Sequence, residues 1–250
     1  MTSEYQIFVL IRFSLHTTKG FYKKMDIKDL YSEERMNIRF DLFEKICLPS
    51  LRLQAETINV VLLVSDVMPL KYLNKLRSYT DINVCILSST DDFSDNRIVL
   101  KNMNNVDNYK YIVTVKLDDD DALHPSFSTK IKHYINTSDV NMLTLVSFIN
   151  GCQYNMIRDE CCECSVKSIA CGLTLISPLN FVRNVYYEPY SNGTVQFKSL
   201  IRLKVIFDET KLMYMLTNHN HNHSLRGKWD NKSKMNYKLW ESMKQNFPFL

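Results

Sequence analysis

Four aspartates stand in a row, Asp118, Asp119, Asp120 and Asp121, directly after the apolar segment 110–117. Adjacent like charges repel by about 1 kcal/mol at roughly 4 Å in bulk water, and by several-fold more at the dielectric of a protein. A hard divalent cation, Mn²⁺ or Mg²⁺, would compensate this charge, because such ions prefer oxygen ligands and take one or two protein carboxylates together with water and phosphate. The row therefore predicts a site for a metal ion and a phosphorylated ligand.

The spacing within the row suggests a role for each carboxylate. Side chains two residues apart in an extended chain point to the same side, so Asp118 and Asp120 are predicted to share the metal. Asp121 is a further candidate ligand, and Asp119 is predicted to contact ribose or sugar hydroxyls. The alternative is a solvated acidic loop that caps a helix beginning near Pro125. A cap needs one carboxylate rather than four, which favours the metal site.

The segments around the row predict an α/β fold. Apolar runs rich in strand-forming residues predict strands at 5–12, 59–65, 82–88, 110–117 and 140–149. Helices are predicted between them, at 33–55, 69–79, 94–103 and 125–134. Pro49 is expected to kink the first helix or to begin a second, short one. This alternation predicts a mostly parallel central sheet flanked by helices, with the aspartates at the carboxyl end of a strand, where such sheets bind ligands.

Composition, charge and the N-terminal segment limit the expected partners and compartment of the chain. The net charge of +4 comes from scattered Lys and Arg residues, so nucleic acid is not a predicted partner. Residues 1–13 lack a basic leader and a small-residue cleavage site, and their apolar stretch is too short to be a transmembrane segment. The seven cysteines are an odd number, which fits a reducing compartment. We therefore expect a cytoplasmic chain.

Five of the cysteines cluster in the second half of the chain, at Cys152, Cys161, Cys162, Cys164 and Cys171. Four thiolates would suffice for a zinc ion, but the paired C-x-x-C spacing of zinc ribbons is missing. Ordinary buried or surface thiols are the favoured interpretation.

Several segments together resemble a family named "putative rhamnosyltransferase", which consists of glycosyltransferases with the GT-A fold. The resemblance is carried by Arg12-Phe13, Arg39-Phe40-Asp41-Leu42-Phe43-Glu44, Cys47-Leu48-Pro49-Ser50-Leu51 with Gln54, and Leu117-Asp118-Asp119-Asp120-Asp121-Ala122-Leu123-His124. It implies a GT-A (Rossmann-like) sheet and a D-x-D motif that binds Mn²⁺ or Mg²⁺. It also implies a UDP-, GDP- or dTDP-linked nucleotide-sugar donor and transfer to a hydroxyl of a glycan acceptor. Rhamnose is the sugar that the family name suggests.

The resemblance also assigns residues to the donor. Asp118 and Asp119 of the motif are implied to bind it. Arg12 is expected to bind donor phosphate or base, with an ion pair to a carboxylate as the alternative. Asp66 follows the second strand and is implied to accept hydrogen bonds from the nucleobase or ribose, whereas as a structural residue it would begin the turn before Pro69.

Residues 151–250 are interpreted as an acceptor half, with a smaller mixed sheet and a C-terminal tail, beside a donor half at 1–150 of the single domain 1–250. Its expected elements are strands near 169–176 and 211–216 and a helix at 229–247. The resemblance implies that a late histidine, His219 or His221, is an additional metal ligand; the alternative is an incidental polar loop.

Inverting transfer also needs a carboxylate that deprotonates the acceptor hydroxyl. Asp159 and Glu188 are the predicted catalytic residues, and Glu160 and Glu163 are not ranked below them by any feature of the sequence.

Two other functions remain open at the level of sequence. A sugar-phosphate nucleotidyltransferase also uses metal-binding aspartates, but it usually carries a glycine-rich N-terminal loop, and segment 14–19 has no glycine. A non-enzymatic binding module organised by zinc at the cysteines is the second alternative.

Overall fold

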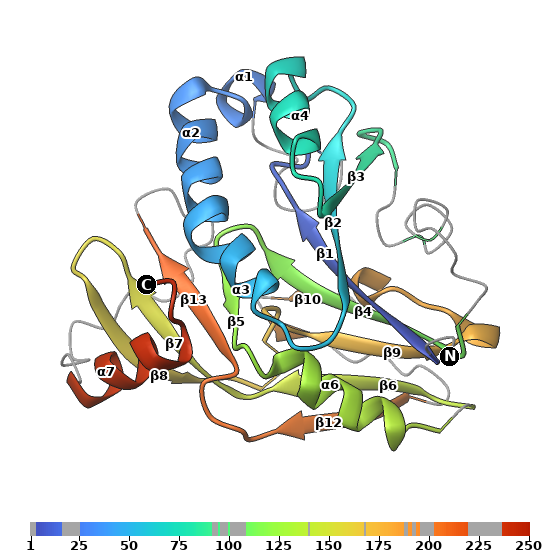
Figure 1. The fold of residues 1–250 in the computed structure, drawn as a ribbon. Helices are drawn as coiled ribbons and strands as arrows, with labels where there is room; N and C mark the ends of the chain where they lie inside the picture. The colour runs from blue at the N-terminus through green and yellow to red at the C-terminus, as the bar shows by residue number, and fades with distance from the viewer. Residues whose placement is uncertain are drawn as a thin grey trace.

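The computed structural model describes residues 4–16, 26–91, 95, 100, 109–139, 141–167, 169–187, 190–191, 194–195, 203–219 and 237–250. Within them, seven strands form a central sheet in the order β12-β6-β9-β4-β1-β2-β3. Their bounds are Leu203–Asp208, Leu143–Phe148, Thr174–Pro178, Tyr111–Asp118, Tyr5–Arg12, Ile58–Ser65 and Ile82–Leu87. β9 runs antiparallel to both of its neighbours, and the other pairs are parallel. The predicted mostly parallel central sheet is confirmed (Figure 1).

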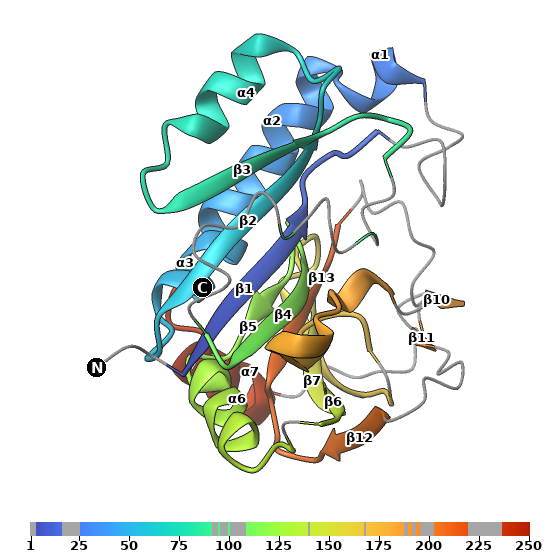
Figure 2. The same cartoon turned by 90° about the vertical axis from the view of Figure 1, so that its right-hand side faces the viewer.

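Helices cover one face of this sheet. They are α1 (Ile27–Leu30), α2 (Glu33–Leu42), α3 (Leu48–Arg52), α4 (Leu70–Arg77) and α6 (Phe127–Asn136). α2, α3, α4 and α6 contribute apolar residues to a core that also contains alternate positions of β1, among them Val9 and Ile11. The intervening positions Phe8 and Leu10 face a second core, which includes the 3-10 turn Val185–Tyr187. Figure 2 shows α2 and α4 beyond the strands and the short turns on the near side.

The helix predicted at 33–55 is interrupted between α2 and α3, and the cause is local. Pro49 has no N–H to donate to the carbonyl of Lys45, and its ring would crowd that carbonyl in a regular helix. The chain widens into a π-helical segment, Phe43–Cys47, in which Leu48 N–H bonds to the carbonyl of Phe43. α3 then begins with the proline in its first turn, so the expected second short helix is confirmed.

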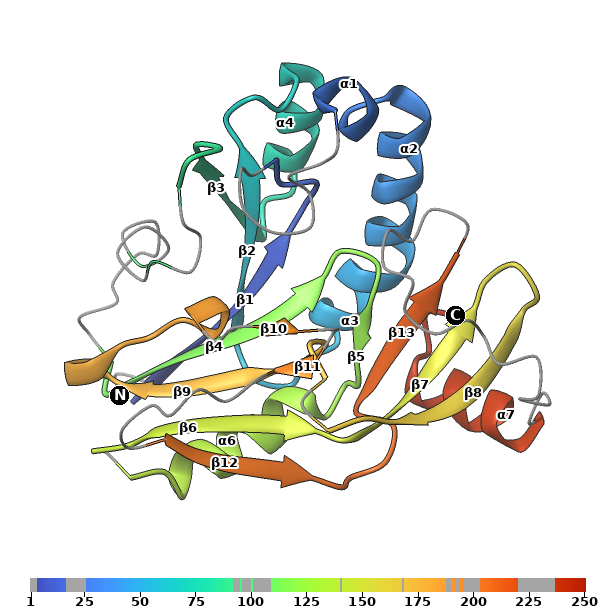
Figure 3. The ribbon, with the colours of Figure 1, turned by 180° about the vertical axis from the view of Figure 1, so that it is seen from behind.

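A smaller mixed sheet lies beside the central one, as predicted. Its strands, in the order β5-β13-β7-β8, are Ala122–Leu123, Tyr214–Asn218, Asn150–Asn155 and Glu160–Ser165. α7 (Tyr237–Asn246) packs against β8, and Figure 3 shows this sheet and helix together to one side of the central strands. A separate hairpin joins β10 (Tyr190–Ser191) and β11 (Thr194–Val195).

Several boundaries in the second half differ from the sequence prediction. The strand expected at 169–176 is β9, which begins at Thr174, and the strand expected at 211–216 is β13, which begins at Tyr214. β7, β8 and β12 were not predicted. The helix expected at 94–103 and the start of the one expected at 229–247 lie outside the described residues, apart from single positions.

Candidate functional site

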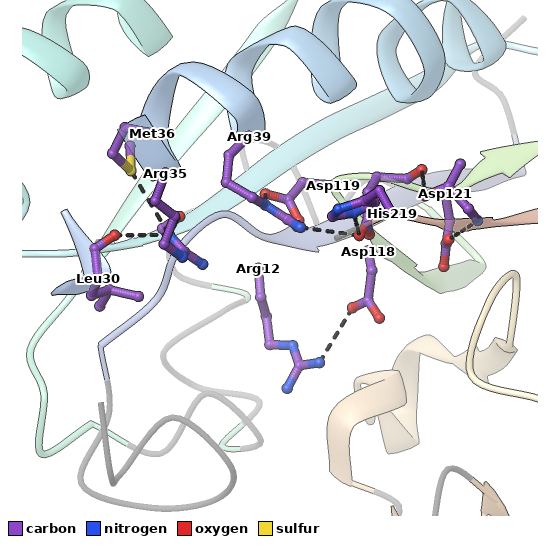
Figure 4. A network of polar contacts seen from close by, with 12 residues as sticks. Arg12, Leu30, Arg35, Met36, Arg39, Asp118, Asp119, Asp121 and His219 are labelled. Atoms are coloured by element: carbon purple, nitrogen blue, oxygen red, sulfur yellow. Dashed lines mark hydrogen bonds and ion pairs between the residues drawn. The ribbon is translucent and has the colours of Figure 1, made fainter. Parts of the chain in front are cut away.

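The candidate site lies at the carboxyl ends of β1 and β4, where the parallel register places Arg12 opposite Asp118. The guanidinium Nη2 of Arg12 donates to Oδ1 of Asp118 over 3.2 Å (Figure 4). Both side chains remain about a quarter exposed, at 23% and 27%. The ion pair considered as the alternative role of Arg12 is therefore present, and it lies at the sheet edge where donor binding was predicted.

The chain turns immediately after this pair. β4 ends at Asp118, and the N–H of Asp121 donates back to the carbonyl of Asp118 over 3.2 Å. We call residues 118–121 the acidic turn. The chain is therefore not extended beyond Asp118, so the argument from an extended chain does not apply to Asp118 and Asp120, and the metal that they are predicted to share stays a prediction.

Arg39 of α2 approaches the acidic turn from the helical face of the sheet. Its Nε donates to Asp119 Oδ2 over 2.9 Å and its Nη1 to Asp120 Oδ2 over 3.0 Å, with a further ion pair from Nη2 to Asp119. The exposed fractions of the three side chains are only 7% for Arg39, 1% for Asp119 and 10% for Asp120. Burial of an unpaired charge would be costly, so each of these groups depends on the others. Internal ion pairs thus supply part of the compensation that the row of aspartates requires.

The end of β13 fixes the far side of the acidic turn. Thr217 donates through its hydroxyl to the carbonyl of Asp120 over 2.7 Å, and through its N–H to Oδ1 of Asp121 over 3.1 Å. His219 follows, and its Nε2 lies 3.0 Å from Asp120 Oδ2. Burial alone would raise the pKa of Asp120, but the charge of Arg39 and the bond with His219 hold it below its ordinary value. His219 therefore reaches the site, whereas His221 lies outside the described residues.

A basic and aromatic group adjoins Asp118 on the other face of the sheet. Tyr186 donates its hydroxyl to the carbonyl of Leu10 over 3.2 Å. Its ring centroid lies 5.4 Å from Cζ of Arg12 and 5.3 Å from Nζ of Lys116. Lys116 is buried and lies two residues before Asp118, so both side chains emerge on one side of β4. The sequence analysis did not single out Lys116, although a lysine inside an apolar strand is a signal in its own right.

Asp66 begins the turn after β2, at the same carboxyl edge of the sheet. Its N–H donates to the carbonyl of Leu87 over 2.9 Å, and its carboxylate accepts from the hydroxyl of Ser65 over 3.3 Å. The side chain is exposed. Its structural role in the turn is thus visible, and its position leaves the carboxylate open to a ligand.

The Cys-Leu-Pro-Ser-Leu segment and Gln54 hold the chain that leaves the acidic turn. Ser50 accepts the N–H of Leu123 at 3.3 Å. Gln54 donates to the carbonyl of His124 over 3.0 Å and accepts the N–H of Ser128 over 3.0 Å. These contacts join α3, β5 and α6. We assign this part of the motif a structural role that the sequence alone did not reveal.

Of the two predicted catalytic carboxylates, only Asp159 lies within the described residues. Asp159 is at the tip of the β7–β8 hairpin, in a left-handed conformation with φ 53°, and it accepts the hydroxyl of Tyr154 over 2.8 Å. The hairpin adjoins the end of β13, since the N–H of Met156 donates to the carbonyl of Asn218. Glu188 lies outside the described residues. A catalytic role for either carboxylate stays a prediction.

The clustered cysteines are free thiols, and the buried ones pack in the core. All seven thiols are free, and Cys152 and Cys161 are buried with Met215 and Phe247 in a small core beneath α7. Burial raises the pKa of Cys161 to about 11 and holds that of Cys152 well above its ordinary value, which disfavours the thiolates that zinc needs. In the part of the chain that the structure describes, no group of three or more His, Cys, Asp or Glu side chains is arranged to hold a metal ion. The structure therefore gives no support to a zinc-organised module.

The class of protein follows from the sheet and the site together. A mostly parallel sheet with one antiparallel strand, an acidic turn at the carboxyl end of β4 and a smaller mixed sheet beside it form the arrangement of the GT-A glycosyltransferases. The sequence model of the family described as "Putative rhamnosyl transferase" matches residues 6–230. The chain belongs to this family, and the predicted fold class and family are confirmed.

The solved structures that this chain resembles share little sequence with it and superpose on it only loosely. The first 349 residues of S. aureus TarS share 14% identity at a TM-score of 0.39, with 86% of this chain and 60% of that one covered. The same fragment with UDP-GlcNAc gives 13% identity, a TM-score of 0.41, and coverage of 90% and 61%. This chain thus spans only about three fifths of the TarS fragment.

Another solved structure is matched over nearly its whole length. A "putative nucleotide-diphospho-sugar transferase" from Desulfovibrio desulfuricans G20 shares 8% identity at a TM-score of 0.41, with 97% of this chain and 96% of that one covered. Among curated protein sequences, none matches this chain. No helix within the described residues is long and apolar enough to cross a membrane.

Proposed function

We propose that this chain is a metal-dependent glycosyltransferase that transfers a sugar from a nucleotide-sugar donor to a hydroxyl of a glycan acceptor. The observation that carries the proposal is the partly exposed pair of Arg12 and Asp118 at the carboxyl edge of the sheet, in a chain of this family. Rhamnose is the proposed sugar because the family description names it. The nucleotide is UDP, GDP or dTDP.

Cationic side chains of this face suit the donor diphosphate. Arg12 offers a planar fork that matches phosphate oxygens, and Lys116 adds a second positive charge beside the same Tyr186 ring. Asp66, exposed at the next strand along, is proposed to accept hydrogen bonds from the nucleobase or ribose. Together these residues would orient the donor so that its sugar points toward the smaller sheet.

The acidic turn fits a divalent cation through Asp118. Hard cations such as Mg²⁺ commonly use one or two protein carboxylates, with phosphate and water as the remaining ligands. Asp118 is the most exposed of the four, while Asp119, Asp120 and Asp121 are buried among protein partners. We therefore propose Asp118 as the principal protein ligand. The cation would balance the charge that builds on the diphosphate as the glycosidic bond breaks.

Thermal unfolding with ligands tests this function. UDP, GDP, dTDP and their sugars would each be added with Mn²⁺, Mg²⁺ or EDTA. A ligand at about a hundred times its Kd adds about 2.7 kcal/mol, and each kcal/mol raises Tm by roughly 2–4 °C in a chain of this size. We expect a metal-dependent shift with one nucleotide, which Asp118→Asn abolishes.

The matched control is Asp41→Asn, which removes an exposed carboxylate that pairs with Lys45 on the same helix. It should retain the full nucleotide shift. A folded wild-type protein that responds to none of the nucleotides, with or without metal, would refute the proposed function.

A further inference from the structure

The part of α2 that carries Arg39 is fixed by the packing of its neighbouring residues in the core. Its neighbour Phe40 packs against Phe13 with ring centroids 5.0 Å apart, and Phe13 in turn lies 5.5 Å from Phe43. Met36, one turn earlier, is also fully buried. The helix therefore presents the guanidinium of Arg39 from a fixed position.

The bonding of Arg39 requires a guanidinium in particular. Its Nε and Nη1 reach two different carboxylates, those of Asp119 and Asp120, at 2.9 and 3.0 Å. A planar fork can bond both at once, whereas an ammonium group is a point charge. Asp119 is 1% exposed and Asp120 is 10% exposed, so these contacts take place away from solvent. Arg39 thus gives these two carboxylates a positive partner from within the protein.

We infer that Arg39 is a positioning residue of the donor site. It holds the carboxylate of Asp119, and together with His219 that of Asp120, so that Asp118 is the carboxylate that faces the bound cation. This inference rests on the proposed function. Its consequence is that the protein alone offers few oxygen ligands to a divalent cation, and that most of them must come from the donor diphosphate. Removal of Arg39 would make the carboxylates of Asp119 and Asp120 more available to a cation bound at the acidic turn.

The test is the binding of Mn²⁺ in the absence of any nucleotide, measured by calorimetry and by the electron paramagnetic resonance signal of free Mn²⁺. Wild-type protein should bind the ion weakly. Arg39→Met should bind it roughly tenfold more tightly or better, because cation affinity rises with the number of charged oxygen ligands. Mn²⁺ should also raise the Tm of this variant more than that of wild type.

Arg35→Met is the matched control. Arg35 lies one turn earlier on α2 and is similarly buried. It donates to the carbonyl of Leu30 over 2.8 Å (Figure 4) and to the hydroxyl of Ser14 over 2.8 Å. Its loss should not tighten Mn²⁺ binding. The comparison separates release of the carboxylates from general loosening of the helix.

Circular dichroism would establish that each variant is folded before titration. If Arg39→Met does not fold, Arg39→Lys keeps the charge but not the fork, and it should show a smaller gain in Mn²⁺ affinity. The inference is overturned if wild type binds Mn²⁺ tightly without nucleotide, or if a folded Arg39 variant gains no affinity. Because nucleotide is absent throughout, failure of the proposed function would show separately, as a lack of nucleotide response in the wild type.

Discussion

Replacement of Asp119 by asparagine would remove one of the two carboxylates that hold the buried guanidinium of Arg39. Loss of one partner from a buried ion pair typically costs about 3–5 kcal/mol, because the other charge stays out of water. Arg39 keeps its bond to Asp120 at 3.0 Å, so we expect the lower end of that range, about 3 kcal/mol. In a chain of this size that loss lowers Tm by roughly 6–12 °C.

Asp118→Asn is the matched comparison, since it makes the same chemical change one residue earlier. The Asp118 side chain is 27% exposed, and pairs at that exposure contribute at most about 1 kcal/mol. Urea unfolding followed by far-ultraviolet circular dichroism, without metal or nucleotide, would measure both. Equal losses from the two variants, or a larger loss from Asp118→Asn, would refute the division of the acidic turn into a structural part and a ligand-facing part.

Three further predictions concern the residues that support the site. Gln54→Ala removes a side chain that bridges α3 to α6 and should cost about 2 kcal/mol in urea unfolding, whereas a loss below about 0.5 kcal/mol would show that water replaces its bonds. Burial would raise the pKa of Asp208, but the hydrogen bonds that it accepts, including one from Tyr134, hold it below the ordinary value of 3.8. Its contribution to stability is therefore complete above that value and is lost as the pH falls through the folded pKa. Asp208→Asn should destabilise the protein at pH 7, and in urea unfolding its difference from wild type should shrink as the pH is lowered below 3.8. Gly151→Ala would place a methyl group 2.5 Å from the carbonyl oxygen and ring of Tyr214, so soluble expression and Tm should both fall, and an unchanged Tm would contradict the close approach of these strands.

The first half of the fold was predictable because its strands are covered on both faces. β1 is YQIFVLIR and β2 is INVVLLVS, and such short, continuous apolar runs are typical of strands buried on both faces of a parallel sheet. Helices between them fix a parallel sheet, and the carboxyl edge of a parallel sheet fixes where the aspartates lie. Arg12, Asp66 and Asp118 were therefore placed at one edge from sequence alone.

The second half was harder to predict because its strands are short and partly exposed. β8 reads ECCECS and is buried at only one of its six positions, so neither its charges nor its cysteines resemble a core strand. β12 is exposed at two of its six positions and is parallel to β6, which precedes it by more than fifty residues. When two paired strands lie this far apart in the sequence, no pattern within either segment indicates that they pair.

The partners of the acidic turn were missed for a related reason. Arg39 lies 80 positions before Asp119, and only the packing of α2 on the sheet brings them together. A local signal did exist, since Arg39 falls three residues after Met36 and four before Phe43, on the apolar stripe of its helix. A charged residue on such a stripe indicates a buried partner of opposite charge. The aspartates that follow β4 were the natural candidates.

The turn geometry explains why four adjacent aspartates can coexist. An extended run would stack alternate carboxylates on one side, and a single cation would have to balance all of them. A turn at the end of β4 instead sends Asp118 toward Arg12, Asp119 and Asp120 toward Arg39, and Asp121 toward the N–H of Thr217. Two guanidinium groups thus compensate the charges of Asp118, Asp119 and Asp120 in part, whereas the donor to Asp121 is an uncharged N–H. The argument for a metal depends on Asp118, the carboxylate that remains most exposed where a donor diphosphate would lie.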